Sequence, residues 1–323
     1  MVDIMKKIVV IEPGYLNYSA EENILQDWDP QFVVVPANAS LEEKLRQVSN
    51  ADAIMVREAT VSRPMIEAMQ QCRVIVRYGV GVDNIDSQAA KEKGIYVANV
   101  PDYGSEDVAE HALALLLAAT RRIATRNRDV RDGQWGIGQR EPMFRLAGKI
   151  LGVVGFGRIS RCFVQKASGI GFKRILVVDP LLTDEQASQA GVTRVNLDTL
   201  CREADFISLH APLTPDTHHL IGEAELAKMK PSAVLVNTSR GGLIDEQALI
   251  NALLQQRIFA AGLDVFESEP LSAKSPLLQM DNTLCTDHTA WFTEESVVEL
   301  QSKAAHEVRR AFEGEHPLNW VNP

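Results

Sequence analysis

The rest of the chain is arranged around the stretch Lys149–Arg161 (KILGVVGFGRISR). It opens with the apolar run Ile150–Val154, which is typical of a strand buried on both faces of a sheet. Gly155 and Gly157 follow directly, and apolar residues then recur at helical spacing from Ile159 onward. We interpret the stretch as a strand, a tight glycine turn and a helix.

The glycine turn suits the binding of a dinucleotide. Gly155 can take backbone angles that a side chain would forbid, and Gly157 leaves no Cβ between the backbone and a pyrophosphate. The unpaired N–H groups at the start of the next helix attract that anion. Ser160 stands where the G-x-G-x-x-G pattern has its third glycine, and a residue this small still lets helix and strand pack closely. In isolation the pattern is weak, because ordinary glycine turns also produce it.

An acidic residue at the end of the next predicted strand, Arg174–Asp179, strengthens this interpretation. About 20 residues after the glycines is where a carboxylate accepts hydrogen bonds from the ribose hydroxyls of the cofactor. Pro180, Leu181 and Leu182 follow, so no basic side chain is at hand for a 2′-phosphate, which Asp179 would also repel. The sequence therefore predicts NAD and not NADP.

The bulk properties narrow the class of protein. With 323 residues, 46% apolar and 24% charged, the chain is expected to form two globular domains. A net charge of −10 argues against nucleic acid as a partner, because phosphate binding needs a basic face. No signal peptide, membrane-spanning stretch or metal site is predicted. The four cysteines are scattered without a C-x-x-C pair, as expected of free thiols in a reducing cytoplasm.

Short apolar strands alternate with helical patterns along the chain, which predicts parallel sheets. The first hundred residues are expected to form a small α/β domain without a glycine fingerprint, and a Rossmann sheet of about six strands is expected within residues 148–290. One long helix, Ser105–Arg128, precedes that sheet, and its apolar face suggests a two-fold dimer. The other predicted strands are Lys7–Ile11, Phe32–Val35, Ala53–Val56, Val74–Val76, Tyr96–Ala98, Asp205–His210, Ala233–Asn237, Ala260–Val265 and Thr283–Thr286.

Several polar residues come directly after predicted strands, where ligands bind in a sheet of this type. The guanidinium of Arg240 has the fork geometry that binds a carboxylate. A histidine bonded to a carboxylate, as His288 could be to Glu269, is held in one tautomer and keeps its proton to higher pH. Singly, Arg240 fits a surface ion pair and His288 a structural histidine, but their convergence on a dinucleotide site favours catalysis. The residues at strand ends are His210, Thr238, Ser239, Arg240, Asp264, Glu269 and His288.

Further stretches extend the pattern over nearly the whole chain. They are Arg77–Asp86, Val108–His111, the glycine turn, His210–Thr214, Asn237–Gly242, Gly262–Phe266 and Asp287–Ala290. On these stretches the sequence resembles the D-isomer specific 2-hydroxyacid dehydrogenases, and its ending His288–Trp291 with Glu267–Pro270 looks most like the C-terminal binding protein branch. Two residues depart from the family pattern: Ser160, and Asp287, which stands where the family more often has proline.

The resemblance implies two doubly wound parallel-sheet domains. Residues 1–101, completed by 292–323, would form a smaller, flavodoxin-like substrate-binding domain, and residues 102–291 a Rossmann NAD-binding domain. It also implies that Arg240 binds the substrate carboxylate, that His288 is the acid/base and that Glu269 pairs with it. Substrate contacts are expected from Arg77, Val80, Gly81, Arg240, His288 and Trp291. Cofactor contacts are expected from Gly155, Phe156, Gly157, Arg158, Ile159, Asp179, His210, Ala211, Pro212, Thr217, Thr238, Ser239, Asp264 and His288.

The predicted activity is the interconversion of a 2-oxo acid and a D-2-hydroxy acid by hydride transfer with NAD, in a cytoplasmic homodimer. Hydroxypyruvate, glyoxylate, a phosphorylated hydroxy acid and bulkier aliphatic 2-oxo acids all satisfy Arg240 and His288, so the substrate stays open. The alternative is an NAD(H)-responsive, corepressor-like binding protein of the C-terminal binding protein type. The intact trio of Arg240, Glu269 and His288 favours the enzyme over this alternative. A formate dehydrogenase is disfavoured, because that chemistry needs no proton donor.

Overall fold

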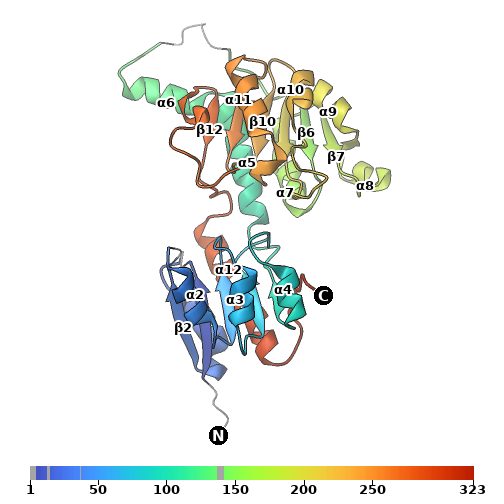
Figure 1. The fold of residues 1–323 in the computed structure, drawn as a ribbon. Coiled ribbons are helices and arrows are strands. Elements are labelled where there is room, and N and C mark those ends of the chain that lie inside the picture. The colour runs from blue at the N-terminus through green and yellow to red at the C-terminus, as the bar shows by residue number, and fades with distance from the viewer. Residues whose placement is uncertain (1–4, 13–14, 37, 137–141) are drawn as a thin grey trace. The chain divides into compact units, whose positions relative to one another are not determined.

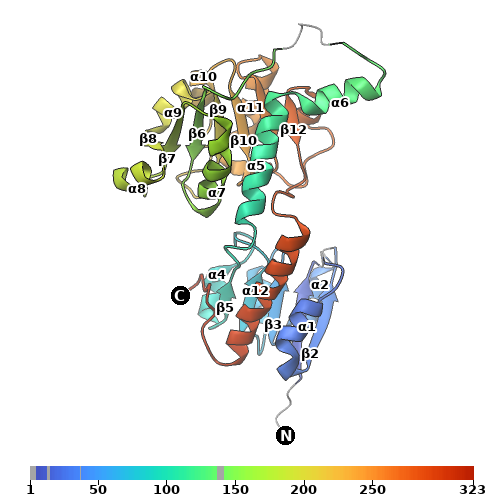
Figure 2. The same ribbon diagram turned by 180° about the vertical axis from the view of Figure 1, so that it is seen from behind.

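The computed structural model describes residues 5–12, 15–36, 38–136 and 142–323 (Figures 1 and 2). The chain divides into two compact units, one of Met1–Gly104 with Thr293–Pro323 and the other of Ser105–Phe292. Each unit is built on its own parallel sheet, which confirms the predicted class of two α/β units. The assignment of the first unit to substrate binding stays a prediction.

In its described residues the first unit has a five-stranded sheet in the order β2-β1-β3-β4-β5. This is the doubly wound order of the flavodoxin type, as predicted. The strands β3 and β4 are buried along their whole length, so each is a continuous apolar run that stands out in the sequence. The strands are β1 (Lys6–Ile11), β2 (Pro30–Val35), β3 (Ala53–Val56), β4 (Val74–Arg77) and β5 (Tyr96–Ala98).

Helices cover both faces of this sheet (Figures 1 and 2). The C-terminal helix α12 (Glu294–Phe312) packs against α1 (Ser19–Leu25) and β4, so the last segment of the chain completes the first unit. Buried in this packing, Glu21 accepts hydrogen bonds from Gln301 and from the hydroxyl of Tyr78. The other helices are α2 (Leu41–Val48), α3 (Arg63–Ala68) and α4 (Ser87–Glu92), with a 3-10 turn η1 (Gln26–Trp28).

The described part of the second unit holds a seven-stranded parallel sheet in the order β12-β11-β10-β9-β6-β7-β8. The strand order reverses at β6, and the carboxyl end of that strand is where a Rossmann sheet binds its ligand. The strand beyond the six expected is the exposed edge strand β8, whose two residues form no apolar run. The strands are β6 (Ile150–Val154), β7 (Arg174–Val178), β8 (Thr193–Arg194), β9 (Phe206–Leu209), β10 (Val234–Asn237), β11 (Ala260–Leu263) and β12 (Thr283–Cys285).

The prediction of one long helix over Ser105–Arg128 is wrong. The structure has two helices, α5 (Ser105–Thr120) and α6 (Ile123–Arg131). Arg122 between them has a φ of +51°, in the left-handed region through which no α-helix continues. Neither glycine nor proline marks the break in the sequence, so no local signal announces it. Helix α6 extends past the β12 edge of the sheet (Figures 1 and 2).

The apolar face of α5 packs inside its own unit, against β10, β11 and α7 (Arg158–Ala167). Ala112, Leu115 and Leu116 are buried there. The helix lies so close to the sheet that a Cβ at Gly262 would be 3.0 Å from the Cβ of Leu115. The predicted dimer was expected to form through this face. Because the face is buried within its own unit, a dimer would need another surface.

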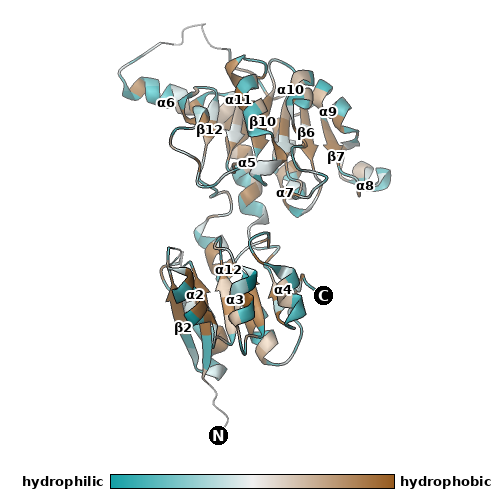
Figure 3. Cartoon of the chain, viewed as in Figure 1, coloured by the Kyte–Doolittle hydropathy of each residue, from teal (hydrophilic) through white to brown (hydrophobic). Residues whose placement is uncertain are grey.

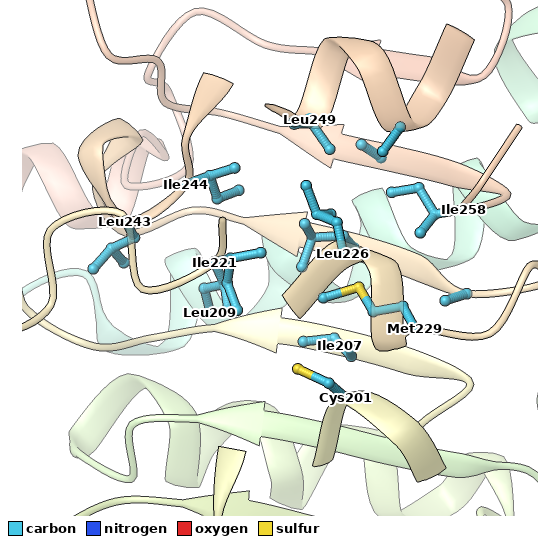
Figure 4. Packing of buried hydrophobic residues seen from close by; sticks show 14 of the residues in the cluster. Cys201, Ile207, Leu209, Ile221, Leu226, Met229, Leu243, Ile244, Leu249 and Ile258 are labelled. Atoms are coloured by element: carbon cyan, nitrogen blue, oxygen red, sulfur yellow. The ribbon is translucent and has the colours of Figure 1, made fainter. Parts of the chain in front are cut away.

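A second core lies among β9, β10, β11 and the helices α9 (Leu197–Glu203), α10 (Glu223–Lys228) and α11 (Glu246–Leu254) (Figure 4). The strands are hydrophobic, and the helices show hydrophilic outer faces (Figure 3). All four cysteines are free. Among the described residues, no helix is long and apolar enough to cross a membrane, and no group of three metal-ligating side chains gathers. The unit also has the helix α8 (Asp184–Gln189) and the 3-10 turns η2 (Ser168–Ile170), η3 (Gly241–Leu243) and η4 (Pro276–Gln279).

Candidate active site

The predicted polar residues of the second unit gather at one edge of its sheet. All the strand pairs of this sheet are parallel, so their carboxyl ends meet at the same edge. Residues just past six neighbouring strands therefore face a common region. They are Gly155 after β6, Asp179 after β7, His210 after β9, Thr238 after β10, Asp264 after β11 and Thr286 after β12.

The glycine turn after β6 has the geometry that a pyrophosphate needs. Gly155 has a φ of +87°, and a Cβ there would lie 2.8 Å from the backbone of His210 and Ala211. A Cβ at Gly157, in contrast, would meet no atom of the described residues within 4 Å, so the space in front of this residue is open. Gly157 is the N-cap of α7 and carries no capping side chain, which leaves the first amides of the helix for an anion.

The other residues of the fingerprint support this turn. Ser160 is fully buried and donates to the carbonyl oxygen of Gly157 at 3.1 Å, so it fills the place of the third glycine without spoiling the packing. The two oxygens of Asp179 accept from the amides of Phe156 and Leu181, each at 2.7 Å. Asp179 thus fastens the glycine turn to the end of β7, and its contact with a ribose stays a prediction. Phe156 is buried, Ile159 is half-buried, and Arg158 is exposed.

The segment after β9 contributes a neutral histidine and a rigid turn. The buried Nδ1 atom of His210 has no hydrogen-bond partner among the described residues, and Nε2 lies 2.9 Å from the hydroxyl of Ser208. Burial lowers the pKa of His210 to about 3. The imidazole therefore carries no charge at neutral pH. The hydroxyl of Thr217 donates to the carbonyl of Pro212 at 2.6 Å and accepts from the amide of Thr214 at 2.7 Å. Ala211 is buried beside this turn.

The segment after β10 positions Arg240. Ser239 donates its hydroxyl to the carbonyl of Leu209, and the side chain of Asn237 donates to the carbonyl of Arg240 at 2.9 Å. The hydroxyl oxygen of Thr238 is buried without a partner in the described structure, which fits a ligand that supplies one. A Cβ at Gly241 would lie 1.9 Å from the carbonyl carbon of Phe266, so the loop that carries Glu269 packs directly on the backbone beside Arg240.

His288 and Glu269 form a pair. Nδ1 of His288 lies 2.7 Å from Oε2 of Glu269, and Oε1 accepts from the amide of Phe266 at 2.9 Å. Burial alone would raise the pKa of Glu269, but the bonds from His288 and Phe266 and the charges of His288 and Arg240 hold it below its usual value. With Nδ1 donating to a carboxylate, Nε2 is the ring nitrogen that can exchange a proton with a ligand. The indole of Trp291 donates to the carbonyl of His288 at 3.1 Å.

Asp264 holds the loop that carries this histidine. It is 1% exposed, and its two oxygens accept from the hydroxyl of Thr286 at 2.5 Å and from the amides of Thr289 and Ala290 at 3.0 and 2.9 Å. Thr286 in turn contacts Nε2 of His111 at 3.0 Å. No role for Thr286 or His111 can be predicted from the sequence, because nothing in a single sequence brings positions 111, 264 and 286 together.

The predicted substrate residues of the first unit form a local cluster at the end of β4. Arg77 is 7% exposed, and its Nη2 atom lies 2.9 Å from Oε1 of Glu58. Its guanidinium folds over the following turn: a Cβ at Gly79, whose φ is +140°, would lie 1.4 Å from Nη1. Val80 is 43% exposed, and Gly81 follows it. The structure describes the two units singly, so joint action of these residues with Arg240 stays a prediction.

Fold and site together define a two-unit α/β protein whose second unit is built to hold a dinucleotide. The open Gly157, the uncapped start of α7 and the unpartnered hydroxyl of Thr238 all fit that ligand. Residues 113–290 match the model of the D-isomer specific 2-hydroxyacid dehydrogenase family, NAD binding domain. The chain belongs to this family, and NAD is the cofactor of its second unit.

Named relatives agree with this assignment. A D-3-phosphoglycerate dehydrogenase of Methanocaldococcus jannaschii is 44% identical over 98% of the chain, which spans 60% of that protein's length. A glyoxylate reductase of Korarchaeum cryptofilum is 40% identical over 86% of the chain and 85% of its own length. The crystal structure of D-lactate dehydrogenase from Aquifex aeolicus, complexed with NAD and lactic acid, matches with a TM-score of 0.87 and 26% identity over 98% of this chain and 99% of that one.

Proposed function

We propose that the protein is an NAD-dependent oxidoreductase that interconverts a 2-oxo acid and a D-2-hydroxy acid. The observation that carries the proposal is the 2.7 Å contact between Nδ1 of His288 and Glu269, at the same sheet edge as the dinucleotide turn and Arg240. The names of the relatives, D-3-phosphoglycerate dehydrogenase and glyoxylate reductase, support this class of reaction.

Each member of the trio has a distinct role in this proposal. Arg240 binds the substrate carboxylate through its planar fork and so orients the 2-oxo group. His288, protonated, gives a proton from Nε2 to the carbonyl oxygen during reduction and takes it back during oxidation. Glu269 holds the ring in the required tautomer and stabilises its charge. The bound nicotinamide supplies or accepts the hydride.

The substrate itself is set by groups around this trio. Beside His288 and Glu269 lies a hollow with apolar walls from Phe266, Leu271 and Leu278, which suits the side chain of a 2-oxo acid. Further substrate contacts stay predictions for Arg77, Val80, Gly81 and Trp291. Hydroxypyruvate, glyoxylate, phosphorylated and aliphatic 2-oxo acids are the candidates.

The test is NADH oxidation by the purified protein with a panel of these acids. We expect turnover with at least one acid, and a fall of about 10²–10⁴-fold in kcat for His288→Ala, the usual effect of losing a positioned general acid. Arg240→Ala should act mainly through a higher KM for the acid. The control is His316→Ala, since His316 stacks on Trp320 in the first unit and should leave turnover unchanged.

The opposite outcome would favour the alternative. If NADH binds while no acid of the panel is reduced, a corepressor-like binding protein of the C-terminal binding protein type becomes the better interpretation of the function. The homodimer and the cytoplasmic location belong to the same proposal.

A further inference from the structure

We infer that Thr286 and His111 are positioning residues, which hold His288 in its working geometry by acting through Asp264. The inference rests on the proposed function for the role of His288. Among the described residues, His111 does not line the hollow beside His288, whereas Thr286 borders it without belonging to the predicted catalytic trio. Their effect is transmitted through hydrogen bonds that start on helix α5 and end on the loop that carries the imidazole.

The backbone at His288 needs such support. Its φ is +57°, in the left-handed region that residues with a side chain rarely adopt and that persists only when surrounding bonds impose it. Asp264 supplies these bonds on both sides of the histidine. Its carbonyl accepts from the amide of His288 at 2.9 Å, and its carboxylate accepts from the amides of Thr289 and Ala290.

The carboxylate of Asp264 is itself held by Thr286. At 1% exposure it has almost no access to water, so its oxygens must be satisfied by protein donors. Oδ1 accepts from the hydroxyl of Thr286 at 2.5 Å as well as from the amide of Thr289 at 3.0 Å. Thr286 is the donor that fixes the carboxylate from the β12 side, because it comes directly after that strand.

His111 completes the chain from α5. The hydroxyl of Thr286 has one proton, and that proton goes to the carboxylate, which cannot donate. Thr286 must therefore act as acceptor toward Nε2 of His111, 3.0 Å away, so His111 carries its proton on Nε2. The neighbours of His111 on α5, Ala109 and Ala112, are buried against the sheet, which anchors this end of the chain.

Removal of one link should displace the reacting group more than it weakens binding. Without the hydroxyl of Thr286, the carboxylate of Asp264 can rotate away from the amides of Thr289 and Ala290. The backbone at His288 then loses the hydrogen bonds that hold its left-handed conformation. A misplacement of about 1 Å can cost on the order of 10²-fold in rate. We therefore expect kcat to fall at least tenfold in Thr286→Val, while the KM values for NADH and the 2-oxo acid change by less than about threefold.

The experiment compares matched variants of the full chain. Thr286→Val and His111→Phe remove one link each, Thr286→Ser keeps the hydroxyl, and His111→Gln keeps a side-chain N–H donor. The control is Thr283→Val, three residues earlier at the start of β12, because the hydroxyl of Thr283 bonds instead to the carbonyls of Leu277 and Met280. We expect a lower kcat in Thr286→Val and His111→Phe. The kcat of Thr286→Ser, His111→Gln and Thr283→Val should stay near that of the unmutated protein. Equal kcat in Thr286→Val and Thr283→Val, or an equal loss in Thr286→Ser, overturns the inference.

A second readout separates this inference from the proposed function. In protein labelled with ¹⁵N in the histidine rings and kept at a pH where the imidazole of His288 is neutral, the ring shifts of His288, assigned by their loss in His288→Asn, report its tautomer. We expect the Nδ1–H form in the unmutated protein and in Thr283→Val, and a mixture of tautomers in Thr286→Val. This result supports the inference even if no 2-oxo acid is turned over. An unchanged tautomer in Thr286→Val contradicts it whether or not the enzyme is active.

Discussion

At the scale of single residues, the two oxygens of Glu269 serve different partners. One pairs with His288 and the other accepts from the amide of Phe266, and these contacts outweigh burial to keep the pKa of Glu269 below its usual value. A depressed carboxyl pKa means that this contribution to stability is complete above the ordinary value near 4.5 and is lost as the pH falls through the lower folded value. Glu269 is therefore ionised throughout the neutral range.

Replacement of Glu269 by Gln tests the consequence for catalysis. An ionised neighbour favours the charged imidazole, so the basic limb of the reduction profile should move to lower pH in Glu269→Gln. In the unmutated enzyme, oxidation needs the neutral imidazole and should have its optimum at higher pH than reduction. The measurement is kcat against pH. The control is Glu267→Gln, which removes a carboxylate paired with His219 instead. Superimposable profiles for Glu269→Gln and the unmutated enzyme would show that the pair does not act together.

Asp179 sets the cofactor preference in our prediction. Asp179→Ala should weaken the binding of NADH and increase the use of NADPH relative to NADH, because the charge that repels a 2′-phosphate is gone. Asp179 also accepts from the amides of Phe156 and Leu181, so part of the loss in Asp179→Ala would come from the turn itself. Asp179→Asn is the matched control, since it removes the charge and keeps one side-chain oxygen. The ratio of kcat/KM for NADH and NADPH is the measurement, and equal use of both by the unmutated protein would contradict the prediction.

At the scale of elements, the turn between β6 and α7 separates a glycine needed for the fold from a glycine needed for the ligand. Gly155→Ala forces a side chain into a backbone with a φ of +87° and against the backbone of His210 and Ala211. We expect a loss of about 1–3 kcal/mol in the free energy of unfolding, or more if the backbone cannot shift.

Gly157→Ala is the counterpart at the same turn. Its φ is −80°, and a Cβ there meets open space, so the thermal midpoint should stay unchanged. The new methyl group would stand where the pyrophosphate approaches, so NADH affinity should fall. Thermal unfolding and fluorescence titration with NADH distinguish the two variants. Normal NADH binding by Gly157→Ala would argue against the pyrophosphate at this turn.

At the scale of the whole molecule, the predicted homodimer needs a surface other than the apolar face of α5. Helix α6 offers one: Ile123 and Val130 are 54% and 53% exposed, and Trp135 just beyond it is 91% exposed. We expect light scattering to give twice the 35.7 kDa of one chain, and the double variant Ile123→Asp, Val130→Asp to give a single chain. The control is Leu254→Asp on α11, where Leu254 is 62% exposed. A monomeric unmutated protein would refute the prediction.

Local sequence patterns are enough to locate the glycine turn, the strand-end residues and the strands other than the short edge strand β8. A parallel strand buried on both faces is a continuous apolar run, so β3, β6 and β5 begin and end where the sequence predicts. The glycine turn is local as well, because the residues that shape it lie within a few positions of one another. Because parallel strands end at the same edge, Arg240, Glu269 and His288 could be grouped before any coordinates were known.

Features that depend on contacts between distant segments could be found only in the folded chain. No residue type in the sequence indicates the helix break at Arg122. The apolar face of α5 has the same sequence pattern whether it packs against a partner chain or against its own sheet. The bonds that run from His111 through Thr286 to Asp264 join three elements far apart in sequence. Hydrogen bonds depend on distances of about 3 Å, and only the folded chain brings these atoms that close.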